Sequence, residues 1–201
     1  MKKTILASCI LIVVALLIST QWGSKAVNAP PEDTLGTADT TLALALSLED
    51  MAKQSDVIAI GSCTETKSVW VDQTLVTLAT VSVTENLKGD ATSLTVALPG
   101  GVDANRKFPI AMTYPGAPQM RPGEDVFLFL TSASDFPGSY TVAGFAQGKF
   151  SIVTDEDGEQ LVTRDLTKMS LKTNNGLHRG QSNATSLSSL KAQVKGYLLN
   201  Q

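Results

Sequence analysis

Apolar and polar residues alternate with a period of two over much of the middle of the chain, as in β-strands that bury one face. The clearest stretch is 75–85, where alanine and valine alternate with threonine and serine. The same pattern predicts strands at 56–70 and 93–98. At the start of the 75–85 segment, adjacent apolar residues break the alternation, which indicates a bulge or bend at that point.

The segment 126–130 is apolar at every position, which predicts a central strand covered on both faces. Shorter strands are expected at 140–146, 150–153 and 160–163. The run from Asp155 to Gly158 predicts the hairpin turn between the last two of these strands. Residues 165–185 are polar and predict a loop.

Two short helices are expected outside the strands. Ser47 to Asp50 resembles a capping box, and the apolar positions that follow predict a helix that ends near Ser55. At the other end of the chain, leucine, valine and tyrosine recur at helical spacing from Leu187 to Leu198. An amphipathic helix is therefore expected to complete the fold.

The segment 99–124 contains five prolines and four glycines between two predicted strands. No regular element is expected to cross it, and long ordered loops of this kind often carry function. Its cations and aromatic rings are residue types enriched at binding hot spots. The candidate binding residues are Arg106, Lys107, Phe108, Tyr114 and Arg121.

The first residues resemble a secretory signal peptide: Lys2 and Lys3 precede an uncharged run at 5–18, and small residues follow it. This run is shorter than the ~20 residues that a membrane-spanning helix needs, so no stable membrane insertion is expected after cleavage. We favour cleavage after Ala26, and Ala29 remains the alternative. The predicted organisation is a signal peptide at 1–26, a flexible leader at 27–45 and a single β-barrel-like domain with a C-terminal helix at 46–201. The protein is expected to be periplasmic or secreted.

Cleavage after Ala26 leaves 13 basic and 19 acidic residues, a formal net charge of −6. No run of more than two basic residues remains, so nucleic acid is not an expected partner. Cys63 is then the only cysteine, and an intramolecular disulfide is excluded. An exported or envelope protein is the partner class that remains.

Few residues offer catalytic or metal-binding chemistry. His178 is the only histidine, and neither an HExxH zinc motif nor a GxSxG nucleophile elbow is present. Cys63 falls in a predicted strand and is interpreted as a buried structural cysteine rather than a nucleophile. The acidic residues around Gly158 lack the first ligand of a calcium loop, because Val153 stands in its place. We therefore assign no catalytic residue, no metal and no cofactor.

The fold class predicted from these elements is mainly β: a small antiparallel barrel with short flanking helices. The expected function is non-catalytic, an exported interaction module that binds a protein or an envelope component through loops at one barrel end. The alternative is a carboxylate-dependent hydrolase of the cell envelope, built on Glu124 and Asp125 or on Asp155 and Asp157. A purely structural envelope protein is a third possibility.

Several fragments between Leu46 and Val162 resemble an uncharacterised family of exported bacterial proteins. Their pattern is also similar to the netrin-like module of tissue metalloprotease inhibitors. The resemblance implies an OB-like barrel with flanking helices. Those inhibitors use an N-terminal cysteine and several disulfides, neither of which this chain has. The matching fragments are Leu48–Glu49, Ser55–Ile58, Glu85–Asp90, Pro99–Gly101, Gly123–Leu130 and Gln147–Phe150.

Overall fold

The computed structural model describes residues 39–200, which belong to one compact unit. The predicted signal peptide, both cleavage positions and the first part of the leader lie outside the described residues. None of the helices within 39–200 is long and apolar enough to cross a bilayer.

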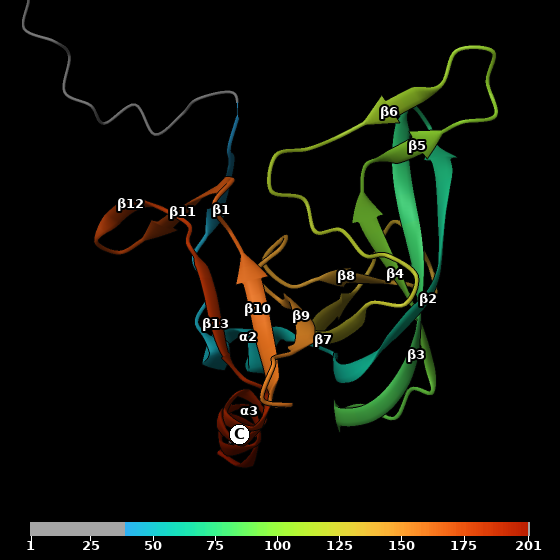
Figure 1. Ribbon diagram of the computed structural model, residues 1–201. Helices are drawn as coiled ribbons and strands as arrows, with labels where there is room; N and C mark the ends of the chain where they lie inside the picture. Colours follow the sequence, from blue (N-terminus) through green and yellow to red (C-terminus); the bar gives the residue numbers. More distant parts are fainter. Residues whose placement is uncertain (1–38, 201) are drawn as a thin grey trace, which may run out of the picture. The chain divides into compact units, whose positions relative to one another are not determined.

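The described residues form two helices and thirteen strands, labelled in Figure 1. The helices are α2 (Leu48–Gln54) and α3 (Leu187–Leu199). The strands are β1 (Thr41–Leu44), β2 (Val57–Val71), β3 (Thr74–Lys88), β4 (Ser93–Pro99), β5 (Gly101–Asp103), β6 (Ile110–Met112), β7 (Asp125–Ser132), β8 (Tyr140–Val142), β9 (Lys149–Thr154), β10 (Gln160–Asp165), β11 (Met169–Thr173), β12 (Gly176–Arg179) and β13 (Ser182–Ser186). The mainly β fold class with short flanking helices is confirmed.

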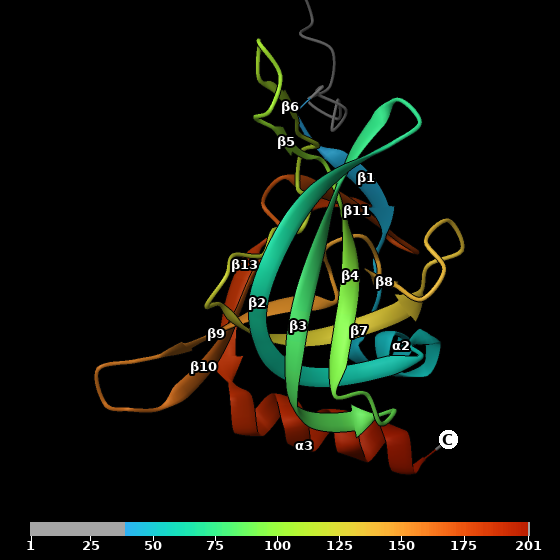
Figure 2. The same cartoon turned by 90° about the vertical axis from the view of Figure 1, so that its right-hand side faces the viewer.

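Five strands are paired in a ring: β7 with β2, β2 with β3, β3 with β4, β4 with β8, and β8 with β7. Only the single parallel residue pair of Val96 with Tyr140 joins β4 to β8. The long strands β2 and β3 curve strongly along the ring, and the β5–β6 ribbon lies at the opposite end from α3 (Figure 2). From β7 the sheet continues outside the ring through β9 and β10 to β13.

The ring encloses one apolar core, and its outer face carries a second. The inner cluster consists of Val57, Ala59, Cys63, Ala79, Val81, Leu94, Val96, Leu98, Met120, Val126, Leu128, Leu130 and Val142. The outer cluster joins the phenylalanines of β7 and β9 to both helices, through residues such as Met51, Leu190 and Val194. Strand β7 is therefore covered on both faces, as its uniformly apolar sequence predicts.

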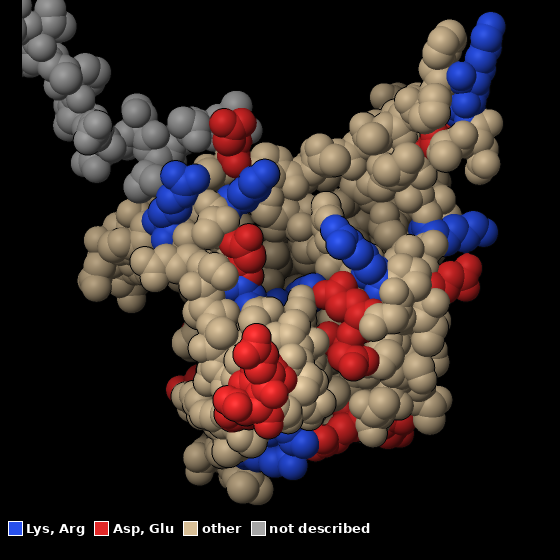
Figure 3. Space-filling model, viewed as in Figure 1, with Lys and Arg blue, Asp and Glu red and all other residues tan. Residues whose placement is uncertain are grey.

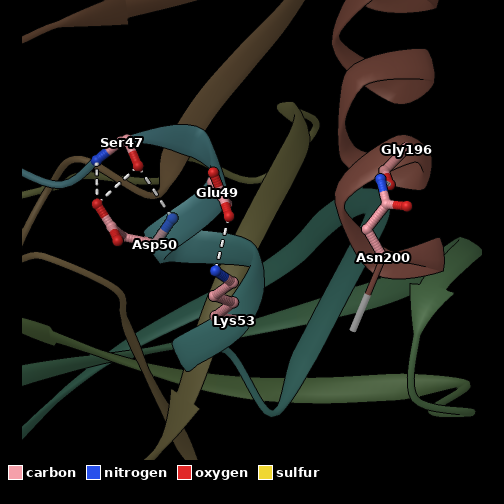
Figure 4. A network of polar contacts seen from close by, with 6 residues as sticks. All are labelled: Ser47, Glu49, Asp50, Lys53, Gly196 and Asn200. Atoms are coloured by element: carbon pink, nitrogen blue, oxygen red, sulfur yellow. Dashed lines mark hydrogen bonds and ion pairs between the residues drawn. The ribbon is translucent and has the colours of Figure 1, made fainter.

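Both helices begin as the sequence predicts. The Ser47 hydroxyl accepts the Asp50 backbone N–H at 3.1 Å, and the Asp50 carboxylate accepts the Ser47 N–H at 3.1 Å, which completes the capping box (Figure 4). At the end of α3, the Asn200 amide donates to the carbonyl of Gly196 at 2.9 Å (Figure 4). These caps satisfy backbone groups that lack partners within the helices.

The prediction of a loop at 165–185 is wrong, because β11, β12 and β13 lie there. Strand β13 is exposed at four of its five residues and is held by backbone pairing with β10 alone. Strands β11 and β12 pair with each other, and β1 joins them in parallel. Since these strands bury few side chains, they leave no clear alternation in the sequence. Thr41–Leu44, expected in the flexible leader, forms β1 because its backbone completes this sheet.

Two smaller expectations also differ from the structure. The segment 99–124 is not wholly irregular, because β5 and β6 pair within it. The register shifts between β2 and β3 lie between Ile58 and Glu65 of β2, opposite residues 80–88 of β3, and not at the start of β3. Adjacent Leu75 and Val76 are both buried because the ribbon covers one face of β3: the Leu75 N–H lies 3.2 Å from Met112 Sδ.

The strand expected at 140–146 ends at Val142. Gly144 and Phe145 both adopt positive φ, of 62° and 70°, which turns the chain sharply before β9. A phenylalanine side chain gives no sequence signal for this left-handed conformation, because residues other than glycine, asparagine and aspartate rarely adopt it. The turn brings Phe145 beside the pocket described next.

Candidate functional site

An apolar pocket of about 400 Å³ lies at the end of the ring where β3 begins and β4 ends. The face of the molecule shown in Figure 3 carries charged side chains of both signs. The pocket lining itself contains no charged side chain. It consists of Thr74, Val76, Ala97, Leu98, Pro99, Tyr114, Pro118, Phe136, Thr141, Val142 and Phe145.

Three separate segments each add one aromatic ring to the walls. Tyr114 comes from the segment after β6, Phe136 from the β7–β8 loop and Phe145 from the turn after β8. Tyr114 is 42% exposed, so its ring stands at the rim of the pocket. The strands of the ring supply the floor, and loops supply the walls.

Gly100 allows the segment that carries Tyr114 to lie close to the ring of strands. Its φ of 91° is in the left-handed region, and a Cβ there would come within 2.6 Å of the Met112 carbonyl oxygen and 3.6 Å of the Tyr114 ring. Only glycine therefore satisfies both the conformation and the spacing. Pro99 before it forms part of the pocket lining.

The turn that carries Phe145 is held by the side chain of Gln147. This side chain is buried, and its Nε2 donates to the carbonyl of Gly144 at 3.0 Å and to that of Leu44 at 2.7 Å. Its Oε1 accepts the N–H of Leu46 at 2.8 Å. A positive φ at a bulky residue costs of the order of 1–3 kcal/mol, so the surroundings must hold it.

Of the five candidate binding residues, only Tyr114 lines the pocket. Arg106 donates from Nε to Asp103 at 2.8 Å, and its guanidinium lies 4.7 Å from the ring centroid of Trp70. Trp70 donates to the same carboxylate at 2.7 Å, which holds the pKa of Asp103 below its ordinary value. Arg106 therefore fixes the ribbon to β2.

The other three candidates are exposed. Phe108, which is 75% exposed, follows Lys107 at the tip of the ribbon, and the Lys107 Nζ lies 5.7 Å from the centroid of its ring. Arg121 lies in the segment before β7, and its N–H donates to the Glu124 carboxylate at 3.0 Å. The structure thus divides the predicted set among the ribbon, the pocket and the start of β7.

Sequence reasoning missed Phe136 and Phe145 as wall residues. Each lies in a stretch whose sequence is typical of a strand or a turn, and neither is near Tyr114 in sequence. The run Phe136-Pro137-Gly138 was the one available signal, because it combines an exposed-loop composition with an aromatic ring. The contribution of Phe145 depends on its positive φ, which the sequence does not reveal.

Three of the four carboxylates proposed for a hydrolase are engaged in other contacts. Glu124 forms an ion pair with Lys149, and the Ser151 hydroxyl donates to it at 2.7 Å. Burial raises the pKa of Glu124, but these hydrogen bonds outweigh burial and the pKa lies below its ordinary value. Asp125 accepts a hydrogen bond from Ser62, and Asp155 accepts the N–H groups of Asp157 and Glu159 within the hairpin turn.

Cys63 and His178 lie apart in the fold. Cys63 is buried in the inner cluster, and burial together with nearby Glu124 raises the pKa of its thiol. This agrees with the structural role expected for Cys63. His178 is exposed on β12, paired with Leu171 of β11. Among residues 39–200, no three His, Cys, Asp or Glu side chains are grouped to hold a metal ion.

No family model, curated protein or solved structure matches this chain. The netrin-like relationship therefore stays a prediction. The pocket and its walls are the basis on which function can be considered.

Proposed function

We propose that this protein is an exported, non-catalytic binding module whose pocket receives an uncharged apolar group of a protein or another envelope component. The observation that carries the proposal is the pocket lining, which combines three aromatic rings with prolines and aliphatic side chains and contains no charge. Its volume of about 400 Å³ falls within the range of small-molecule sites. Thr74 and Thr141 add hydroxyl groups to the lining, and the Thr141 hydroxyl lies 3.1 Å from that of Thr131.

The binding reading is favoured over the hydrolase by the state of Glu124. A glycosidase-type acid needs a raised pKa to hold its proton near neutral pH. The pKa of Glu124 is lowered, and its charge is compensated by Lys149. This residue is therefore suited to hold β9 against the start of β7 rather than to donate a proton.

The pocket is tested with the uncharged dye N-phenyl-1-naphthylamine, whose fluorescence rises in apolar surroundings. We expect dye affinity to fall at least about tenfold in Tyr114→Ala and Phe136→Ala, because each removes a wall of aromatic contact. Phe108→Ala is the matched control, since Phe108 is a more exposed aromatic outside the pocket. Equal binding by all three variants, or no binding by the unaltered protein, would refute the proposal.

Export is tested separately by N-terminal sequencing of the protein recovered from its producing cell. A mature chain that begins at Val27 is expected, because Ser24 to Ala26 forms the favoured cleavage box. Recovery of an intact Met1 form in the membrane fraction, or of a lipid on Cys9, would contradict export by this signal.

A further inference from the structure

Strand β1 is hydrogen bonded to two walls of the pocket. The Thr41 hydroxyl donates to the carbonyl of Pro115 at 2.6 Å, directly after Tyr114. At the other end of the strand, Leu44 and Leu46 bond to the side chain of Gln147. A four-residue strand thus connects the Tyr114 segment to the turn that carries Phe145.

Gln147 acts on β1 as a neighbouring strand would. Odd-numbered residues of this segment bond to β11 and the residue before it, as the N–H groups of Thr41 and Ala45 do with the carbonyls of Lys168 and Lys172. The Leu44 carbonyl and the Leu46 N–H face the other edge, where the Gln147 amide supplies one donor and one acceptor. One side-chain amide therefore takes the place of a peptide group in a ladder.

The same amide is also hydrogen bonded to the turn that carries Phe145. Gln147 Nε2 donates to Gly144 as well as to Leu44, so the turn and the strand share one donor group. A Cβ at Gly144 would lie 2.8 Å from this nitrogen and 2.8 Å from a methyl carbon of Leu46. If β1 detaches, the Gln147 side chain loses its hydrogen bonds to Leu44 and Leu46, and the strained φ of Phe145 is then stabilised by fewer contacts.

Strand β1 is also an element whose departure costs the core little. Leu42 and Leu44 are 65% and 68% exposed, and no residue of β1 belongs to the cluster inside the ring. Only Ala43 packs against a buried cluster, the small one of Ala146, Leu166 and Met169. Elements with few buried contacts open with a lower free energy than the core.

We propose that β1 is a strap that couples the two walls: attached, it holds the Tyr114 segment and the Phe145 turn in place, and detached, it releases both and opens the pocket. The proposal rests on the proposed binding function for its purpose, although the coupling itself needs no ligand. Because coupling is reciprocal, a group bound in the pocket strengthens the attachment of β1.

Native-state hydrogen exchange of the full chain measures the coupling without a ligand. Gln147→Met removes the three side-chain hydrogen bonds to Leu44, Leu46 and Gly144 while it keeps the length of the side chain. We expect at least a tenfold faster exchange at the Leu46 N–H and, across the pocket, at the Ala117 N–H, which donates to Tyr114 at 3.1 Å. The Leu128 N–H in β7 reports that the ring remains folded.

Thr41→Val gives the reciprocal experiment, because it removes one hydroxyl at the opposite end of the strap. Faster exchange at the Gln147 and Gly148 amides of the far turn is expected. Leu42→Ser is the matched control, since Leu42 lies on β1 but its side chain is exposed. Faster exchange confined to the altered wall in both variants would overturn the strap, even if both variants fold and bind the dye.

The dye separates this proposal from the proposed function. In the unaltered protein, saturating N-phenyl-1-naphthylamine should slow exchange at Leu46 several-fold and leave Leu128 unchanged. If no dye binds but hydrogen exchange at the two walls is still coupled, the proposed function is refuted and the strap proposal is kept. Dye binding with no effect on Leu46 would refute the strap and keep the pocket.

Discussion

Glu124 shows how one side chain can satisfy several partners at the start of a strand. Its carboxylate accepts from Lys149, from Ser151 and from the Arg121 N–H, and its backbone carbonyl accepts the Cys63 N–H at 2.8 Å. The residue therefore links β2, β7 and β9. A charge in such a place has consequences for stability as the pH changes.

We expect the free energy of unfolding to depend on pH through Glu124. Its folded pKa lies below the ordinary 4.5, so its stabilising contribution is complete above about pH 5 and is lost as the pH falls through 4.5 and the folded value. In Glu124→Gln this acid-dependent loss should be smaller when urea unfolding is followed from pH 7 to pH 3. Glu156→Gln, at an exposed turn position, should keep the full loss; equal curves for both variants would contradict the assignment.

The burial of Cys63 predicts that its thiol reacts slowly in the folded protein. The thiol is 1% exposed and its raised pKa keeps it protonated, so a thiol reagent should modify the folded protein only through opening of the ring. Cys63→Ala should unfold with a free energy about 1–2 kcal/mol lower and should bind the dye as the unaltered protein does. Rapid labelling of the native protein, accompanied by loss of dye binding, would show that the site was misjudged.

At the scale of single elements, α2 depends on its first turn. Its seven residues are too few for a stable helix in isolation, so capping and packing must hold it. Its last turn also receives Lys88 from β3, whose Nζ donates to the carbonyl of Ala52 at 3.1 Å. The helix is thus fixed at both ends by side chains.

Ser47→Ala should lower the free energy of unfolding by about 1 kcal/mol, because the Asp50 N–H loses its acceptor. Ser47→Thr keeps a hydroxyl at the same place and should restore most of the loss. Chemical denaturation of the three proteins measures the difference. Identical midpoints for all three would mean that the capping box contributes nothing to this helix.

Elements with a buried face could be predicted from the sequence, and elements held by backbone pairing could not. Strands β2, β3 and β4 and both helices can be predicted because their buried positions repeat with a clear period, and β7 because its apolar run is uninterrupted. The short strands β11 to β13 escaped because most of their residues are exposed and polar. For the site, composition identified the segment that carries Tyr114, whereas Phe136 and Phe145 depend on tertiary contacts.

At the scale of the whole molecule, measurements of partner binding can show whether the ribbon or the pocket recognises the partner. Replacement of Arg106, Lys107 and Tyr114 together with alanine should abolish partner binding with little change in melting temperature. Because Arg106 and Lys107 lie outside the pocket lining, Tyr114→Ala alone should account for the loss measured with the dye. If the Arg106→Ala and Lys107→Ala pair removes partner binding while dye binding persists, the ribbon is a second recognition surface. A loss of folding in the triple variant would show that its side chains serve the structure instead.

The parallel pairing of β1 with β11 joins residues near opposite ends of the described chain, Thr41 to Met169. A contact so distant in sequence cannot form until the chain has been synthesised as far as β11. The ring can assemble earlier, because its last strand, β8, ends at Val142. The order of synthesis therefore makes β1 among the last segments to dock, and a chain cut short before β11 should retain the ring while its N-terminal strand stays unpaired.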